Sequence, residues 1–107
     1  WEEMLQRESM RAGADRLDFV VVVTPNHAHY APVKGFLEAG FHVVCDKPLV
    51  HTAEEADALV TLAKARGVVL AVTYNYSGYP MVRRAAELVA SGALGTVRKA
   101  FVEYHQG

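Results

Sequence analysis

Lys47 is the residue of this sequence best suited to chemistry. It stands in the stretch VVCDKPLVHT, residues 43–52, directly after an apolar run and directly before Pro48. A residue that precedes proline is restricted to extended geometry, so this lysine is expected to point over the end of the apolar run. Partial burial there would favour the neutral amine. The alternative is an ordinary solvated lysine in a turn, and the residues alone leave both interpretations open.

Polar and aromatic side chains gather in three turns, each of which follows an apolar run. The turns are TPNHAH at 24–29, DKPLVH at 46–51 and TYNYSGY at 73–79. Open parallel sheets bind ligands outside the carboxyl ends of their strands, where such turns meet. Their convergence therefore favours a binding site over chance. The polar and aromatic residues concerned are Thr24, Asn26, His27, His29, Asp46, Lys47, Tyr74, Asn75 and Tyr76.

Structural roles are the alternative for several of these residues. His29 stands where a helix is expected to begin, so its side chain is expected to cap that helix, with a role in binding as the alternative. The tyrosines of the third turn are typical of packing at a domain junction. The remaining histidines are not spaced as ligands on one helix face and the chain has a single cysteine, so no metal site is expected.

The elements that must position these turns follow from the apolar pattern. Five consecutive apolar residues at 19–23 predict a strand buried on both faces, and 41–45 and 68–73 predict two more strands. A helix is expected to begin near His29 and to close at Gly40. The pair Thr52 and Glu55 forms a capping box for another helix, which ends at Gly67. The order β-α-β-α-β predicts a parallel sheet with helical crossovers.

Both ends of the chain carry further expected elements. Residues 1–13 predict a surface helix that ends in Gly13. Pro80 is expected to open a helix with an apolar side, and the closing stretch 96–107 predicts a half-exposed strand that begins a different sheet. The apolar side of the helix that Pro80 opens consists of Met81, Val82, Ala85, Leu88 and Val89.

The Lys47–Pro48 bond is a candidate for a cis peptide, because X–Pro bonds prefer trans only weakly.

Composition excludes several classes of protein. The 107 residues carry a formal net charge of −1 with mixed signs, so nucleic acid and anionic membranes are not expected partners. No apolar stretch approaches the roughly 20 residues of a membrane helix. Cys45 has no second cysteine with which to form an intrachain disulfide, which suits the cytoplasm. Because the chain starts at Trp1, it is expected to be a piece of something longer.

Four successive blocks closely resemble the glucose-fructose oxidoreductase / inositol dehydrogenase family (Gfo/Idh/MocA). They are DFVVVVTPNHAH at 18–29, AGFHVVCDKPL at 39–49, VTYNYSGYPMVRRA at 72–85 and GALGTVRKAFVEYHQG at 92–107. The resemblance implies the second half of a Rossmann doubly wound α/β domain, residues 1–78, followed at 79–107 by a linker helix and the first strand of a substrate domain. The chain has no G-x-G-x-x-G turn, and the resemblance places that turn before Trp1.

The resemblance also implies roles for individual residues. Lys47 matches a lysine that reaches the nicotinamide of NAD or NADP and the reacting hydroxyl, and is the implied catalytic residue of this chain. Asp46 replaces the more usual glutamate of that motif. The family's catalytic histidine and its acidic partner are expected beyond Gly107. The implied cofactor-binding residues are Thr24, Pro25, Asn26, His29, Asp46, Lys47, Pro48 and Asn75.

The function that this resemblance implies is an oxidoreductase, homo-oligomeric and cytoplasmic, that transfers hydride to or from a carbinol carbon of a sugar, cyclitol or related polyol. The alternatives are a non-catalytic binding or sensory protein on the same scaffold and a structural or assembly module. Without the glycine-rich turn, residues 1–107 alone are expected not to bind NAD with useful affinity. They are also expected to associate through the strand at 19–23, which would be an edge of the sheet.

Overall fold

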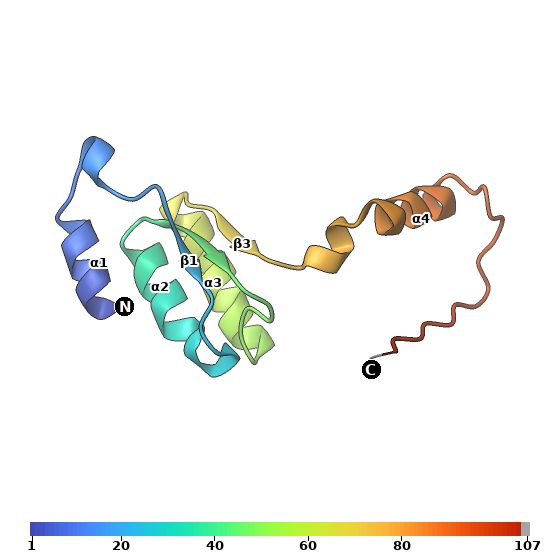
Figure 1. The fold of residues 1–107 in the computed structure, drawn as a ribbon, viewed down its shortest axis with the longest axis horizontal. Helices are drawn as coiled ribbons and strands as arrows, with labels where there is room; N and C mark the ends of the chain where they lie inside the picture. The colour runs from blue at the N-terminus through green and yellow to red at the C-terminus, as the bar shows by residue number, and fades with distance from the viewer. Residues whose placement is uncertain (106–107) are drawn as a thin grey trace. The chain divides into compact units, whose positions relative to one another are not determined.

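A three-stranded parallel sheet forms the centre of the computed structural model, which describes residues 1–105 (Figure 1). The strands are β1 (Phe19–Val22), β2 (His42–Cys45) and β3 (Leu70–Val72), in the order β1-β2-β3. Val22 pairs with Cys45, and Cys45 pairs with Val72, so the carboxyl ends of all three strands lie at one edge. This arrangement confirms the predicted parallel β-α-β-α-β order.

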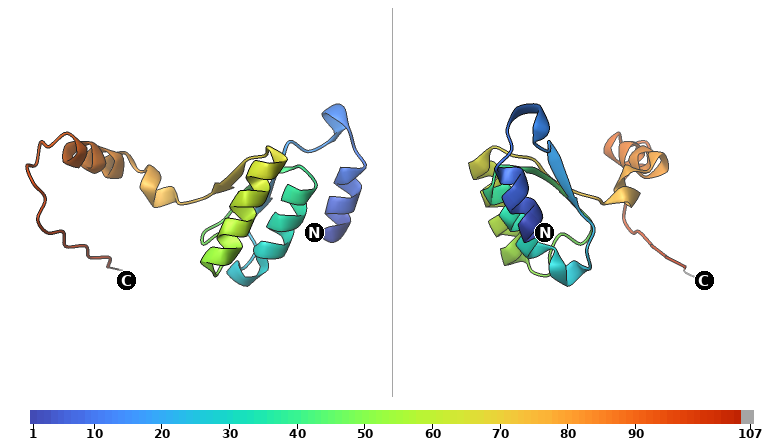
Figure 2. Two further views of the ribbon diagram at one scale, coloured as in Figure 1. Left: turned by 180° about the vertical axis from the view of Figure 1, so that it is seen from behind. Right: turned by 60° about the vertical axis from the view of Figure 1, so that its left-hand side comes forward.

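Two helices form the crossovers between these strands and cover one face of the sheet (Figure 2). Helix α2 (Tyr30–Glu38) follows β1, and α3 (Ala53–Arg66) follows β2. The Thr52 hydroxyl accepts a hydrogen bond from the Glu55 N–H at 3.2 Å, and Gly67 ends α3 with φ +65°, as the sequence predicts. The core between helices and sheet contains Val20, Val22, Val33, Phe36, Leu37, Phe41, Val43, Cys45, Leu49, Leu59 and Ala63.

The expectation that the first strand is buried on both faces is wrong for this structure. Val20 and Val22 are buried against the helices, whereas Phe19 is 54% exposed and Val21 is 51% exposed on the opposite face. Successive side chains of a strand point to opposite faces, and the described residues cover only one of them. As expected, β1 is an edge of this sheet, with β2 as its one partner among the described strands.

The first helix is shorter than the sequence predicts. Helix α1 (Glu2–Ser9) ends four residues before Gly13, which instead opens a 3₁₀ turn, Gly13–Asp15. The helix packs on α2 through Trp1, whose ring centroid lies 6.4 Å from that of Phe36. Residues 10–13 are exposed, so no packing extends the helix to the glycine.

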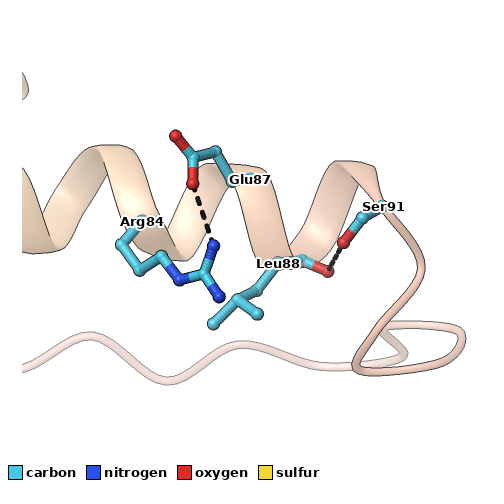
Figure 3. A network of polar contacts seen from close by, with 4 residues as sticks. All are labelled: Arg84, Glu87, Leu88 and Ser91. Atoms are coloured by element: carbon cyan, nitrogen blue, oxygen red, sulfur yellow. Dashed lines mark hydrogen bonds and ion pairs between the residues drawn. The ribbon is translucent and has the colours of Figure 1, made fainter.

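The chain divides into two compact units, Trp1–Tyr74 and the part from Asn75 onward. In the second unit a 3₁₀ turn, η3 (Asn75–Gly78), precedes α4 (Pro80–Ala90), which has proline at its first position as predicted. On α4, Arg84 pairs with Glu87 at 3.1 Å and the Ser91 hydroxyl donates to the Leu88 carbonyl at 3.2 Å (Figure 3). The assignment of residues 1–78 and 79–107 to two domains stays a prediction.

The strand predicted at 96–107 is wrong over its described part. Residues 96–105 adopt no strand, and Gln106 and Gly107 lie outside the described residues. Strand geometry in isolation leaves every backbone donor and acceptor unpaired, and the described residues contain no second sheet against which this segment could pair.

Candidate functional site

Hydrogen bonds tie the ends of all three strands together at the carboxyl edge of the sheet. Asp46 follows β2, and its backbone N–H donates to the Val22 carbonyl at 2.9 Å. The Asp46 Oδ1 atom accepts two further hydrogen bonds, from the Lys47 N–H at 2.8 Å and from the Thr73 hydroxyl at 2.7 Å. Asp46 therefore connects β1, β2 and the end of β3, and fixes the backbone from which Lys47 projects.

These bonds also set the ionisation of Asp46. The Thr73 hydroxyl, followed by the Lys47 N–H, holds the pKa of the Asp46 carboxyl below its ordinary value, because both donors favour the charged form. Electrostatic interactions with Lys47 and His29 act in the same direction on the Asp46 carboxyl, and burial opposes them. Asp46 is thus a fixed negative charge at this edge of the sheet.

Thr73 is a site residue that the sequence analysis does not identify. Its signal is present in the register, since Cys45 pairs with Val72 and the next residues along the two parallel strands are Asp46 and Thr73. An acid and a hydroxyl at adjacent strand ends are natural hydrogen-bond partners. The pattern is visible only after the strands have been paired.

Lys47 is exposed, so the partial burial expected for it is wrong in this structure. Its backbone is held by Asp46, and the Lys47–Pro48 peptide is cis, as expected for this turn. The ammonium group therefore stands on a fixed turn and is free to contact a bound molecule at the carboxyl edge.

His29 has a position that the sequence analysis does not predict. It precedes α2, as expected, but its side chain makes no capping hydrogen bond to that helix. Instead the ring is fully buried, with Nδ1 2.8 Å from the Pro48 carbonyl oxygen and Nε2 2.8 Å from the Thr24 carbonyl oxygen. The expected helix cap is wrong, because the ring points between two turns rather than back along its own helix.

The turn after β1 carries the other residues expected beside the cofactor. Thr24, Pro25 and Asn26 are exposed, and the 3₁₀ turn η2 (Asn26–Ala28) leads them into α2. The Thr24 hydroxyl donates to the Ala28 carbonyl at 3.2 Å, which steadies this turn. The contacts of His29 link the turn directly to the Lys47–Pro48 turn, so the structure brings these two predicted parts of the site together.

Asn75 opens η3 in the second unit, and its expected cofactor contact stays a prediction. In the same unit the rings of Tyr76 and Tyr79 pack together with centroids 5.5 Å apart.

Within residues 1–105, no cluster of three His, Cys, Asp or Glu side chains could hold a metal ion. No helix in the described part of the chain is long and apolar enough to cross a membrane.

Geometry and fold together define a class of protein. Parallel strands with helical crossovers, and polar turns that meet at the carboxyl edge, are typical of an α/β nucleotide-binding domain. Residues 1–74 match the model of a family described as "Oxidoreductase family, NAD-binding Rossmann fold". The chain belongs to this family, Gfo/Idh/MocA, which confirms the resemblance given by its sequence blocks.

Relatives and solved structures agree with this assignment. The chain is 37% identical over 78 residues to levoglucosan dehydrogenase of Pseudarthrobacter phenanthrenivorans, covering 73% of this chain and 20% of that protein. It is 32% identical to the scyllo-inositol 2-dehydrogenase (NADP+) IolW of Bacillus subtilis, covering 84% and 25%. An inositol dehydrogenase homolog from Azotobacter vinelandii, complexed with NAD+, is similar with 41% identity and a TM-score of 0.83, covering 91% and 24%.

Two facts follow from these matches. The chain spans between a fifth and about a quarter of the length of the curated relatives, 20% of one and 27% of another. The family has an NAD-binding fold and includes an NADP-dependent relative, which confirms NAD or NADP as the cofactor class.

Proposed function

We propose that this chain supplies the nicotinamide side of the active site in an oxidoreductase that transfers hydride to or from a carbinol carbon of a sugar, cyclitol or related polyol. The observation that carries the proposal is Lys47, an exposed ammonium on a turn held by Asp46 at the carboxyl edge of a Rossmann sheet. Relatives named for levoglucosan and scyllo-inositol support the polyol class of substrate.

The residues present fit the nicotinamide half of NAD or NADP. The exposed turn at 24–26 offers a threonine, a proline and an amide side chain, and the His29 ring joins this turn to the turn that carries Lys47. The chain has no glycine-rich turn for the pyrophosphate. When bound, the oxidised cofactor accepts the hydride from the substrate carbon. We assign contacts along the nicotinamide to Thr24, Pro25, Asn26, Lys47 and Pro48.

Lys47 has the direct role in the reaction. An ammonium group donates hydrogen bonds to a substrate hydroxyl and stabilises negative charge on its oxygen as the proton leaves. Asp46 fixes the backbone of Lys47 and adds an acceptor beside it. Asn75 follows β3 and is assigned to the same cofactor. The histidine that removes the hydroxyl proton in this family is expected outside this chain.

His29 has a different assignment from the one that the resemblance implies. Both of its ring nitrogens lie against backbone carbonyls and the residue has no exposed surface. It therefore offers no ring nitrogen to a cofactor in this structure. We assign it to holding the two turns that contact the cofactor.

The test is turnover of the whole protein with NAD+ and NADP+ against a panel of polyols and sugars. Lys47→Ala is expected to lower turnover by about 10²- to 10⁴-fold, the range for loss of a positioned proton-handling group, with little change in thermal stability because Lys47 is exposed. Lys64→Ala, which removes an exposed lysine from α3, is the matched control and should leave turnover unchanged.

Two results would contradict the proposal. Unchanged turnover in Lys47→Ala would remove the lysine from the reaction. Tight binding of NAD(H) with no turnover on any polyol or sugar would instead favour the alternative of a binding or sensory protein on the same scaffold.

A further inference from the structure

The surroundings of the His29 ring are unusual for a histidine. The residue has no exposed surface, and each of its ring nitrogens lies 2.8 Å from a backbone carbonyl oxygen. The Nδ1 atom faces the carbonyl of Pro48 and the Nε2 atom faces that of Thr24. Both distances are those of good hydrogen bonds, so both nitrogens are in close polar contact with an acceptor.

A neutral imidazole cannot satisfy two acceptors. It carries one N–H and one bare nitrogen, and a carbonyl oxygen has no proton to give. One of the two contacts would then set a nitrogen lone pair against an oxygen lone pair at hydrogen-bond distance in a buried place. An unpaired buried acceptor of this kind is costly, and the other tautomer only moves the conflict to the second contact. An imidazolium ring, with an N–H on each nitrogen, satisfies both carbonyls.

We propose that His29 is held as a doubly protonated imidazolium that donates to the Thr24 and Pro48 carbonyls, and so acts as a positioning residue for Lys47. The charge strengthens both hydrogen bonds, because charge-assisted bonds are stronger than neutral ones. The ring thereby clamps the turn after β1 to the turn that carries the lysine. The positioning role rests on the proposed function, whereas the protonation of the ring does not.

Charges around the ring act in both directions. Asp46, whose pKa is lowered partly by His29, is the acid that attracts the imidazolium. Burial of the ring opposes its charge, as do Lys47, one residue before Pro48, and the N-terminus of α2. Lys47 is exposed and therefore screened by solvent, and the end of a helix dipole contributes less than a single charge-assisted hydrogen bond. Of the other titratable groups close by in sequence, His27 is exposed and Tyr30 is half-buried.

His42 provides the opposite case within the same chain. Its Nδ1 atom accepts a hydrogen bond from the Val69 N–H at 2.9 Å, so this nitrogen must be unprotonated. The first unit thus contains a histidine that faces two acceptors and a histidine that faces a donor. The two rings serve as internal references for each other.

The decisive experiment is nuclear magnetic resonance on the whole protein with ¹⁵N-labelled histidine rings at neutral pH. For His29 we expect both ring nitrogens to show directly bonded protons, and for His42 we expect a bare Nδ1. The rings are assigned through their own backbone connectivity in the unmodified protein, so the result does not depend on whether a variant folds. A bare nitrogen on His29 in the folded protein would overturn the proposal.

Two variants test the positioning role. His29→Asn replaces two separate ring nitrogens with one amide nitrogen on a shorter side chain, so the bridge between the two carbonyls is lost. It should lower kcat by about 10²-fold, as misplacement of a catalytic group does, with a smaller change in KM. It should also speed amide hydrogen exchange in the segment 46–49, at the N–H groups of Asp46, Lys47 and Leu49. His105→Asn, at an exposed histidine of the second unit, is the control and should change neither quantity. Unchanged exchange at 46–49 in a folded His29→Asn protein would overturn the clamp.

The two proposals fail in different ways. A whole protein without oxidoreductase activity, but with two protonated nitrogens on His29 and with exchange at 46–49 that depends on His29, would refute the proposed function and support the clamp. An active enzyme with a bare His29 nitrogen would support the function and refute the imidazolium.

Discussion

Helices α3 and α4 both carry apolar residues spaced three and four positions apart, yet these residues are buried in one helix and exposed in the other. In α3, Leu59 has no exposed surface and Ala63 is 5% exposed, because the helix lies on the sheet and against α2. In α4, Met81 is 76% exposed and Val89 is 51% exposed, and no residue of the helix is buried. The same kind of pattern therefore produces a helix in both units, but it produces a core only where a second layer is available.

Local interactions explain why α4 forms without a covered face. Proline at the first position fixes the backbone there, and the Arg84–Glu87 pair and the Ser91 hydroxyl add contacts within the helix (Figure 3). Each such contact contributes only a few tenths of a kcal/mol. Helix formation can thus be separated from burial, and substitutions in the two helices should separate them in an experiment.

The largest expected difference is between Leu59→Ala and Val89→Ala in the 107-residue chain. Removing a fully buried leucine should cost about 2–5 kcal/mol of unfolding free energy, since it leaves a cavity between α3 and the sheet. Removing the half-exposed Val89 side chain should cost less than about 0.5 kcal/mol. Urea unfolding followed by circular dichroism measures both values.

Repeating the pair in the whole protein would sharpen this comparison. A cost for Val89→Ala that rises towards that of Leu59→Ala would mean that other parts of the protein cover α4 there. Equal free-energy costs of Leu59→Ala and Val89→Ala in the 107-residue chain itself would contradict the difference in burial between the two helices.

A smaller effect is expected within a single strand. Val20 and Val22 of β1 are buried, whereas Val21 between them is 51% exposed. Val22→Thr places a hydroxyl in the core and should cost about 1–3 kcal/mol. Val21→Thr places the same hydroxyl at the exposed face and should cost almost nothing in the monomeric chain. The matched pair is measured by the same urea titration, and equal costs would contradict the one-sided burial of β1.

The sequence predicts much of this fold because the signals concerned are local. Apolar runs, the cap at Thr52 and the glycines at the ends of α2 and α3 act within a few residues, so strands and helices fall where expected. Whether Val21 and the apolar side of α4 are buried depends on packing partners that the apolar pattern does not specify. The predicted strand at 96–105 fails for the same reason, since a strand needs a neighbour.

The features of the candidate site also divide into those that follow from local sequence and those that depend on distant partners. Lys47 and its neighbours follow from the position of a turn after a strand, which is local information. The Thr73 hydroxyl bonds to Asp46, which lies 27 positions away in the sequence. The His29 ring contacts the carbonyls of Pro48 and Thr24, which lie 19 and 5 positions away. These contacts exist only after the strands have been placed side by side. Sequence reasoning therefore finds the exposed lysine, but it misses what holds the lysine in place.

The hydrogen bond from Thr73 to Asp46 gives a prediction about pH. The lowered pKa of Asp46 means that this carboxylate stabilises the fold above its unfolded pKa, about 3.9, and that the stabilisation is lost as pH falls through the folded pKa. Thr73→Val removes the largest cause of the lowering, so the variant should be less stable than the wild type at neutral pH. This difference should narrow in acid.

Thermal unfolding of both proteins across the acidic range measures that difference. Thr61→Val, a substitution at an exposed position of α3, is the control and should show no such change with pH. A difference between wild type and Thr73→Val that stays constant down to strongly acidic pH would show that the hydroxyl does not act through the Asp46 charge.

The folded first unit should also slow a chemical reaction at Cys45. This thiol ends β2 with no exposed surface, and burial, followed by the charge of Asp46, raises its pKa to about 11. Only the thiolate reacts with alkylating reagents, so at pH 8 the folded chain should be modified far more slowly than the same chain unfolded in urea. Mass spectrometry after timed exposure to iodoacetamide measures both rates. Because the reagent must wait for the strand to open, the rate should also rise in Leu59→Ala, which loosens the layer above β2, and stay unchanged in Val89→Ala. Equal rates for the folded and unfolded chains would mean that the core around β2 is open to solvent, and the contrast between the two units would then fail at its better packed side.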